Sequence, residues 1–276
     1  MGKKPDKIAL IAGSGKYPLY LLREIKKTGA EVVVLVLGDE AEPALNEEAD
    51  KVHILNIGQL GKMIKTCRDE YAQKVIFAGR LAHDNIYKKL ELDKRALSLL
   101  IKLKDRKADT ILNAIAGEFS KDGLELIDSI QYMSGYFSPP GILTKQKPTK
   151  KEQDDIKFGF KIAKGIAGFD IGQTVVVKDN AVLAVEAMEG TDLAIRRGAE
   201  LGHEGVVVVK VSKPAQDRRF DLPVMGMHTV KVARDCGVRV IAFSAGMTLL
   251  LDRDEMVKTC NSHGIVLAAI QEKNEQ

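Results

Sequence analysis

Short apolar runs alternate with amphipathic segments along the first half of the chain. The run from Ile8 to Ala12 ends in Gly13-Ser14-Gly15, after which Leu19, Leu22 and Ile25 recur at helical spacing. This order predicts a buried strand, a glycine turn and a helix. Further predicted strands cover residues 32–37, 52–55 and 75–78, and further predicted helices cover residues 59–71, 85–104 and 108–121. Buried strands that alternate with helices pair in parallel, so we expect a Rossmann-like first domain.

The pattern changes where prolines and a glycine gather between residues 138 and 150. This composition predicts a linker over residues 138–150, between domains at residues 1–137 and 151–276. Thr149 and Glu152 have the spacing of a capping box at the start of a helix. Predicted strands follow at residues 174–177, 182–185, 206–211, 238–243, 248–251 and 265–270, and predicted helices at 193–201, 227–236 and 253–263. The first two strands flank Lys178-Asp179-Asn180 and predict a hairpin, so we expect an α/β second domain with a mixed sheet.

The composition fits a globular protein with room for two cores. The 276 residues are 45% hydrophobic, and the formal net charge is +4. Basic and acidic residues are mixed along the chain and only 5% of residues are aromatic, which argues against nucleic acid as a partner. We see no transmembrane stretch and no signal peptide, so we expect a cytoplasmic protein. The isolated cysteines and scattered histidines lack zinc-binding spacing, which argues against a zinc hydrolase.

The segment from Lys213 to Pro223 concentrates charge just after a predicted buried strand. It contains Asp217 and Asp221 together with the basic residues Lys213, Arg218 and Arg219. Two carboxylates beside cations can hold a divalent ion and neutralise phosphate charge, as phosphoryl transfer requires. An exposed, solvated loop has the same composition, so this pattern alone leaves both interpretations open.

A second candidate is the glycine turn after the first strand. The backbone amides of Gly13-Ser14-Gly15 and the N-terminus of the next helix can receive a phosphate. The third glycine of a dinucleotide fingerprint is missing, because Tyr17 and Pro18 occupy that stretch. Phosphate contact and a purely structural turn both remain open. The first alternative to a phosphate-hydrolysing enzyme is an NAD(P)-linked oxidoreductase, in which Asp39 would bind the ribose of the cofactor.

Two more motifs lie where α/β proteins bind ligands. Gly79 and Arg80 end the fourth predicted strand, where Arg80 can bind phosphate or make an exposed salt bridge. Glu189-Gly190-Thr191-Asp192 precedes a predicted helix, so Thr191 or Asp192 can contact a ligand or cap that helix. The chain has no serine nucleophile elbow and no Walker lysine motif. A carboxylate and magnesium site is therefore the best chemistry that these residues supply.

Taken in order, four motifs resemble those of the LpxI-type UDP-2,3-diacylglucosamine pyrophosphatases, over about residues 7 to 270. The motifs are Ile11-Ala12-Gly13-Ser14-Gly15 with Pro18, Ala78-Gly79-Arg80, Glu189-Gly190-Thr191-Asp192, and Lys213-Pro214-Ala215-Gln216-Asp217 with Asp221 and Pro223. The resemblance implies a magnesium-dependent hydrolase of Gram-negative lipid A biosynthesis that produces 2,3-diacylglucosamine 1-phosphate (lipid X) and UMP. It also implies two α/β domains with the substrate in the cleft between them.

The resemblance also implies roles for individual residues. The implied substrate-binding residues are Gly13, Ser14, Gly15, Tyr17, Pro18, Gly79, Arg80, Glu189, Gly190, Thr191, Asp192 and Gln216. The implied catalytic residues are Asp221, Asp217 and Lys213, and the implied Mg²⁺ ligands are Asp221, Asp217 and Asp192. We expect Asp221 to be the essential carboxylate, because Pro223 fixes the backbone near it. Arg80 or Arg219 would join Lys213 in stabilising charge on the phosphates.

With an amphipathic UDP-sugar lipid as its substrate, the protein is expected to act close to a membrane. The apolar stretch 96–101, followed by Ile111, Leu112, Ile115 and Phe119, can line grooves for the acyl chains. The lysines at positions 88, 89, 102, 104 and 107 can bring this face to the cytoplasmic surface of the inner membrane as a weak peripheral contact. They can equally form core and a solvated face. From the resemblance we also expect a homodimer through an exposed sheet edge of the second domain. The second rival function is a non-enzymatic nucleotide-binding protein with structural carboxylates.

Overall fold

The computed structural model describes residues 6–38, 42–80, 91–104, 108–213, 219–220 and 222–272. These residues divide into two compact units. The first unit contains the described residues up to 134 together with Arg219 and Phe220, and the second contains residues 135–213 and 222–272. Residues 138–150, where the sequence suggests a linker, belong to the second unit and contribute a strand to its sheet.

A five-stranded parallel sheet with the order β3-β2-β1-β4-β5 forms the centre of the first unit. Its strands are β1 (Lys7–Ala12), β2 (Glu31–Leu37), β3 (Lys51–Leu55), β4 (Lys74–Ala78) and β5 (Glu125–Leu126). Every residue of β1 and β2 after the first is buried, which is typical of a parallel sheet covered on both faces. The predicted Rossmann-like fold of this unit is confirmed.

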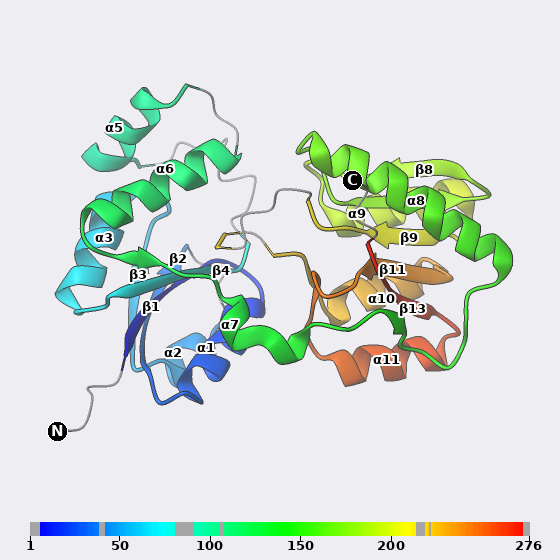
Figure 1. Ribbon diagram of the computed structural model, residues 1–276, viewed down its shortest axis with the longest axis horizontal. Coiled ribbons are helices and arrows are strands. Elements are labelled where there is room, and N and C mark those ends of the chain that lie inside the picture. Colours follow the sequence, from blue (N-terminus) through cyan, green and yellow to red (C-terminus); the bar gives the residue numbers. More distant parts are fainter. Residues whose placement is uncertain are drawn as a thin grey trace. The chain divides into compact units, whose positions relative to one another are not determined.

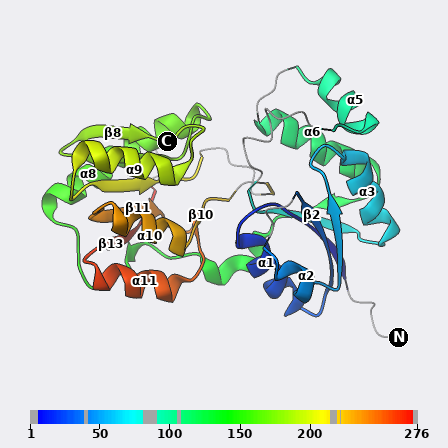
Figure 2. The same cartoon turned by 180° about the vertical axis from the view of Figure 1, so that it is seen from behind.

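Helices cover both faces of this sheet. They are α1 (Tyr17–Lys26), α2 (Leu45–Glu48), α3 (Leu60–Asp69), α5 (Lys94–Lys102), α6 (Ala108–Lys121) and α7 (Ile130–Met133). Figures 1 and 2 show α1 and α2 on one side of the sheet and α3 and α6 on the other. Successive residues of β1 point to opposite faces, so that Ala9 and Ile11 pack with Met63 of α3 and Phe119 of α6.

A six-stranded mixed sheet with the order β6-β13-β11-β9-β7-β8 forms the centre of the second unit. Its strands are β6 (Gly141–Ile142), β7 (Thr174–Lys178), β8 (Ala181–Val185), β9 (Val207–Lys210), β11 (Val240–Ser244) and β13 (Val266–Ile270). Strands β9, β11 and β13 are parallel, while β6, β7 and β8 pair antiparallel with their neighbours. The predicted mixed sheet is confirmed. Two short strands, β10 (Val224–Met225) and β12 (Leu249–Leu250), form a separate parallel pair.

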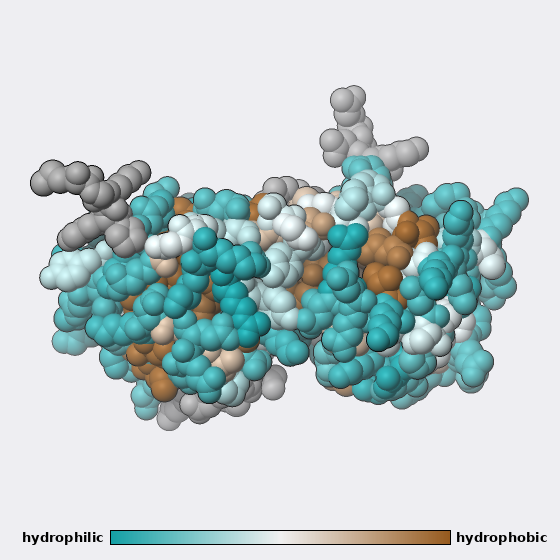
Figure 3. Space-filling view, turned by 90° about the horizontal axis from the view of Figure 1, so that it is seen from below, coloured by the Kyte–Doolittle hydropathy of each residue, from teal (hydrophilic) through white to brown (hydrophobic). Residues whose placement is uncertain are grey.

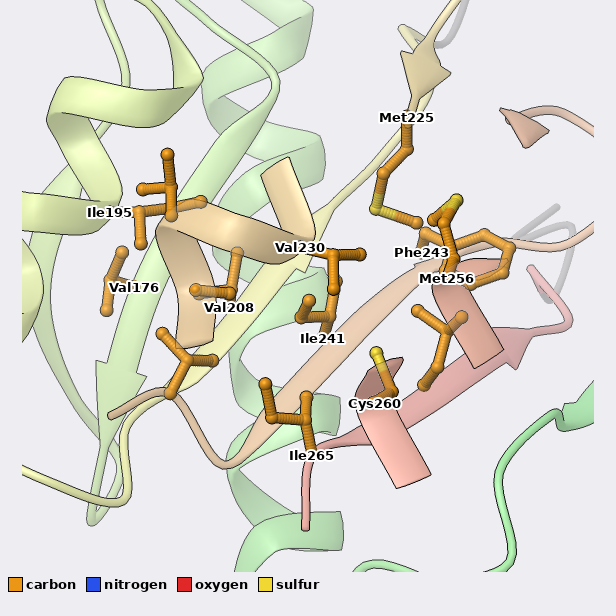
Figure 4. Close-up of a cluster of buried hydrophobic side chains, with 14 of the residues drawn as sticks. Val176, Ile195, Val208, Met225, Val230, Ile241, Phe243, Met256, Cys260 and Ile265 are labelled. Carbon is orange, nitrogen blue, oxygen red and sulfur yellow. The ribbon is translucent and has the colours of Figure 1, made fainter. Parts of the chain in front are cut away.

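The helices of the second unit also lie on both faces of its sheet. They are α8 (Lys150–Gly168), α9 (Thr191–Gly202), α10 (Met227–Asp235) and α11 (Arg253–Ser262). Helix α8 begins at the predicted capping box of Thr149 and Glu152 and packs on one face. The other three helices pack on the opposite face, where Figure 4 shows Ile195 of α9 beside Val176 of β7 and Val230 of α10 beside Ile241 of β11.

Strands β7 and β8 form the predicted hairpin. Its two turn residues, Asp179 and Asn180, have positive φ angles of 55° and 56°. Short polar residues tolerate this conformation, and a turn of this kind matches the twist of the paired strands. The Asp155 carboxylate of α8 accepts hydrogen bonds from both turn N–H groups, at 3.2 and 2.7 Å. The hairpin is therefore held by a helix as well as by its own turn.

The face of the molecule that Figure 3 shows is mostly hydrophilic, and its hydrophobic residues lie in separate areas. Exposed large hydrophobic side chains occur in both units, and they include Ile54, Tyr71, Leu97, Ile101, Phe169, Met188, Leu193 and Leu201. Within the described ranges, no helix has the length and apolarity needed to cross a membrane.

Glycines let the helices of the second unit approach the sheet closely. A Cβ atom on Gly198 of α9 would lie 2.5 Å from Val176 Cβ of β7, which is closer than carbon atoms pack. A Cβ atom on Gly165 of α8 would meet nothing within 4 Å. Gly198 is therefore needed for the close contact of its helix with the sheet, whereas Gly165 is not needed for any such contact.

Replacing Gly198 with alanine is expected to lower the free energy of unfolding by about 2 kcal/mol, because the added methyl group forces α9 away from the sheet. The matched variant Gly165→Ala is expected to raise it by about 0.5 kcal/mol, because alanine loses less backbone entropy in a helix. Denaturant unfolding of both variants measures the two effects. Equal changes in both would contradict the close contact of α9 with β7.

Candidate functional site

Hydrogen bonds join the glycine turn after β1 to the end of β4. The Gly13 N–H donates to Ala78 O at 2.8 Å, the Ser14 N–H donates to Arg80 O at 2.9 Å, and the Arg80 N–H donates to Ser14 O at 3.0 Å. The Ser14 hydroxyl also donates to Arg80 O, at 3.2 Å. Two motifs that are far apart in the sequence thus form one structure in the first unit.

Glycine is required on both sides of this contact. A Cβ atom on Gly13 would lie 2.4 Å from Arg80 O, and one on Gly79 would lie 2.8 Å from Gly13 C and 2.9 Å from Pro18 Cγ. Gly79 also has a φ of +94°, in the region that side chains disfavour. These glycines are therefore needed for chain packing whatever the ligand, and the amides of Gly13 and Ser14 are already used.

The same edge of the unit presents a helix N-terminus and a basic side chain. Helix α1 begins at Tyr17 with Pro18 in its first turn, and Gly15 is exposed just before it. The N-terminus of a helix carries partial positive charge and binds anions. Arg80 is exposed at this edge, and nothing in the described part of the chain forms an ion pair with its guanidinium. This combination suits a phosphate group.

The hydroxyl group of Tyr17 lies in the core of the unit. It donates a hydrogen bond to Ser129 Oγ at 2.6 Å, just before α7. Burial raises the pKa of Tyr17 to about 12, and the hydrogen bond to Ser129 offsets only part of this effect. The phenol stays protonated and links α1 to the start of α7. A contact of Tyr17 with a ligand would have to come from its backbone.

The first unit also anchors part of the charged segment. The Phe220 ring lies 5.4 Å from the Phe77 ring of β4, and Phe77 in turn makes an edge contact of 5.8 Å with Phe119 of α6. Arg219 donates a hydrogen bond to Asn113 Oδ1 of α6 at 3.3 Å. Because Phe77 is two residues before Gly79, this anchor lies close in sequence to the edge that carries Arg80. Gln216, Asp217, Asp221 and Asp39 lie outside the described residues.

The sequence pattern gives no sign of a role for Phe77, Asn113 or Phe220. An aromatic residue in an apolar strand has the same pattern whether it packs in the core or holds a distant segment. A polar residue on an exposed helix face likewise gives no signal of its partner. The anchor could not be recognised without the structure.

The turn before α9 carries the second group of candidate residues. Gly190 is the N-cap residue, with a φ of +84°, and Thr191 and Asp192 lie in the first turn of the helix. The suggestion that Thr191 or Asp192 caps the helix is therefore wrong. Glu189 accepts a hydrogen bond from Arg197 at 2.6 Å. Partial burial acts to raise the pKa of Glu189, but the hydrogen bonds that it accepts hold the pKa below its ordinary value.

Thr191 belongs to a polar network beneath this turn that sequence analysis missed. Its hydroxyl donates to Glu186 Oε1 at 2.8 Å and accepts from Lys210 Nζ at 2.8 Å. Thr174 Oγ1 lies 3.5 Å from the same hydroxyl. Burial acts to raise the pKa of Glu186, but the charge of Lys210 and the surrounding hydrogen bonds leave the pKa lowered. The network holds the start of α9 on the end of the sheet.

Asp192 has one carboxylate oxygen in use and one without a partner. Its Oδ2 atom lies 3.1 Å from His228 Nε2, in the first turn of α10. Its Oδ1 atom is buried and has no hydrogen-bond partner among the described residues. A buried carboxylate oxygen without a donor costs free energy, and a bound cation would satisfy it. Asp192 therefore fits the role of one metal ligand.

The other two expected metal ligands, Asp217 and Asp221, are outside the described residues. Within the described ranges, no group of three or more His, Cys, Asp or Glu side chains is placed to hold a metal ion. Of the three expected Mg²⁺ ligands, Asp192 is the one within the described residues.

Lys213 lies just beyond β9 and forms an ion pair with Asp170, which follows α8. The backbone before it is held from two sides, because the Ser212 N–H donates to Ser244 Oγ at 3.1 Å and Lys164 Nζ donates to Ser212 O at 2.8 Å. The structure therefore fixes the start of the charged segment and balances the Lys213 charge with a carboxylate.

Comparison with solved structures gives only weak likenesses. An ADP complex of N5-carboxyaminoimidazole ribonucleotide synthetase is 16% identical with a TM-score of 0.27, and the match covers 63% of this chain and 32% of that one. A biotin carboxylase from Campylobacter jejuni is 12% identical with a TM-score of 0.29, and the match covers 71% of this chain and 42% of that one. This chain thus spans less than half of either structure, and neither likeness carries an argument about function.

Comparison of the sequence identifies one family over nearly the whole chain. The LpxI N-terminal domain matches residues 7–136, and the LpxI C-terminal domain matches residues 139–268. A curated relative, the UDP-2,3-diacylglucosamine pyrophosphatase LpxI of Caulobacter vibrioides, is 34% identical over 278 residues. The match covers 96% of this chain and 97% of the relative. The resemblance found in the four motifs is therefore confirmed, and the chain belongs to the LpxI family.

Proposed function

We propose that this protein hydrolyses the pyrophosphate bond of UDP-2,3-diacylglucosamine and releases 2,3-diacylglucosamine 1-phosphate and UMP. The observation that carries the proposal is the 34% identity to a UDP-2,3-diacylglucosamine pyrophosphatase over 96% of the chain. The matched family domains follow one another in the expected order. The reaction would place the protein in lipid A biosynthesis.

The nucleotide phosphates would bind at the carboxyl edge of the first sheet. Arg80 supports this placement because it is exposed there and has no ion-pair partner among the described residues. The N-terminus of α1 adds a second group that favours an anion. The amides of Gly13 and Ser14 contribute by shaping this edge rather than by binding phosphate, because both donate to the end of β4.

A Mg²⁺ ion held by Asp221, Asp217 and Asp192 would neutralise charge on the pyrophosphate oxygens. The buried, unpartnered Oδ1 atom of Asp192 supports its part in this set. Lys213 and either Arg80 or Arg219 would stabilise charge on the phosphates. Lys213 would have to exchange its Asp170 partner for a phosphate oxygen. Following the family resemblance, we place the substrate in the cleft between the two units.

The substrate also bears on location and assembly. A diacylated sugar nucleotide suits a cytoplasmic protein that makes weak peripheral contact with the inner membrane. We further propose a homodimer through an edge strand of the second sheet, where β8 has one unpaired side in the sheet order.

An NAD(P)-linked oxidoreductase is not favoured, because the glycine turn lacks the third fingerprint glycine and its first two amides are occupied.

UMP release from detergent-dispersed UDP-2,3-diacylglucosamine tests the proposed reaction. We expect release with Mg²⁺, its loss with excess chelator, and its recovery when Mg²⁺ is restored. UDP-N-acetylglucosamine, which has no long acyl chains, serves as the matched substrate and should react far more slowly. Folded protein that releases no UMP with any divalent metal, yet is stabilised against heat by NAD(P), would refute the proposal and favour the oxidoreductase.

A further inference from the structure

Helix α5 has apolar side chains on two opposite faces. Its inner face contributes Ala96 and Leu99 to the core that α3 and α6 share, and both side chains are buried. Its outer face presents Leu97 and Ile101, which are 50% and 74% exposed. Figure 1 shows α5 beside α6 at the margin of its unit. The core explains the inner residues of this helix and leaves the outer ones without a function.

Lysines surround the two exposed aliphatic side chains. Lys94, Leu97 and Ile101 follow one another at spacings of three and four residues, so they lie on one face, and Lys102 lies at the edge of that face as the last residue of the helix. Lys104 is exposed just after the helix. None of these three lysines makes an ion pair with any residue in the described ranges. The outer face of α5 therefore combines apolar groups with free positive charge.

The other charged groups at α5 are already paired. Arg95 binds Glu118 and Asp122 of the neighbouring α6 region. Asp93 caps the helix through the Ala96 N–H at 2.9 Å and also accepts from the Gly61 N–H at 2.6 Å. Glu91 is the exposed acid nearest to this face in the described sequence. The net charge offered by the outer face is thus positive.

We propose that the outer face of α5, defined by Lys94, Leu97, Ile101, Lys102 and Lys104, docks the protein on an anionic lipid bilayer. The inference rests on the proposed function, since an enzyme that acts on a diacylated sugar nucleotide must meet its substrate at a lipid surface. Leu97 and Ile101 insert at the level of the headgroups, and the lysines bind lipid phosphates. Charge complementarity selects an anionic bilayer rather than a neutral one.

The expected binding is weak, reversible and sensitive to salt. Each lysine close to an anionic surface strengthens binding by about five-fold, so the three lysines together contribute about 100-fold. Two partly exposed aliphatic side chains add about ten-fold. Because ionic strength screens the lysines, most of the binding should be lost at about 0.5 M salt.

Co-sedimentation with lipid vesicles tests the docking surface. The full-length protein should bind vesicles of phosphatidylcholine with one quarter phosphatidylglycerol, and should bind pure phosphatidylcholine vesicles at least ten-fold more weakly. The variant Leu97→Gln/Ile101→Gln should lose about ten-fold in partition coefficient, and Lys94→Gln/Lys102→Gln about 25-fold. The matched variants are Leu201→Gln, at a leucine of α9 that is 62% exposed, and Lys161→Gln on α8. Both should bind like the unmodified protein.

Absence of binding to anionic vesicles, or equal binding by the α5 and matched variants, would overturn the proposal. Light scattering that shows a dimer lost in Leu97→Gln/Ile101→Gln would overturn it in favour of self-association. UMP release in detergent separates this inference from the proposed function. The α5 variants should keep the unmodified rate there, because no bilayer is present, whereas failure of the unmodified protein to release UMP would refute the reaction whatever the vesicles show.

Discussion

Replacing Lys210 with methionine is expected to lower the free energy of unfolding at neutral pH by about 3 kcal/mol. The loss arises because Lys210 is the cation that balances Glu186, and its removal leaves a largely desolvated carboxylate with only neutral donors. Thr191 loses the hydrogen bond from the ammonium group at the same time. Denaturant unfolding measures the change, with Lys161→Met on the exposed face of α8 as the matched variant.

The deficit of Lys210→Met should depend on pH in a defined direction. In the unmodified protein the pKa of Glu186 is lowered, so its contribution is complete above the ordinary value of 4.5 and is lost as the pH falls through the folded value. Without Lys210, burial dominates and raises the folded pKa above the ordinary value. The variant then takes up a proton on folding, so its deficit should shrink from pH 7.5 to pH 5.

Adding Glu186→Gln to Lys210→Met should restore much of the lost stability, because an amide does not need a balancing charge. A deficit that is the same at both pH values, or that persists in the double variant, would show that Lys210 stabilises the unit through packing alone. The result bears on the candidate site because this network holds Thr191, and with it the turn that presents Asp192.

Asp221→Asn is expected to reduce kcat for UMP release by about 10³-fold while changing KM less than three-fold. The amide keeps the size of the side chain but removes the negative charge that metal binding and orientation of a water molecule both need. The neighbouring anchor should preserve the fold of the segment, since Phe220 remains packed on Phe77 and Arg219 remains bonded to Asn113. Steady-state kinetics in detergent and thermal unfolding measure the two properties separately.

Asp217→Asn is the matched variant, four residues earlier in the same charged segment. We expect kcat of Asp217→Asn to fall by about ten-fold, which is a smaller loss than that of Asp221→Asn. If Asp217→Asn is the more damaging change, the essential carboxylate is Asp217. Near-normal turnover in both variants would remove this segment from the reaction altogether.

Local patterns were sufficient to predict the long elements of both units. Strands β1 and β2 are continuous apolar runs because both of their faces are covered, and the β7–β8 hairpin follows from Asp179 and Asn180 in its turn. The two-residue strand β6 could not be predicted, because its pairing of Ile142 with Ala268 depends on a contact between distant parts of the chain. The same reason explains why residues 138–150 look like a linker.

The positions of the site motifs could be predicted better than the use of their atoms. The sequence pattern indicates that Gly13 and Ser14 bind phosphate, whereas in the structure their amides donate hydrogen bonds to the end of β4. Lys213 reads as a phosphate ligand, but its ammonium group is paired with Asp170. In each case the partner is distant in sequence, and only the fold determines which polar groups meet.

The anchor of Phe220 on Phe77 has a consequence for synthesis of the chain on the ribosome. Phe77 belongs to the first unit, which is complete at residue 134 except for the segment with Arg219 and Phe220. Most of that unit can therefore fold while the second unit is still being synthesised. Arg219 and Phe220 emerge much later, flanked on both sides by chain that belongs to the second unit. A fragment that stops near residue 134 would lack Phe220, so Phe77 would keep its contact with Phe119 and lose the other one. The segment with Asp221 can join its partner only as a late event, after most of the protein has been translated.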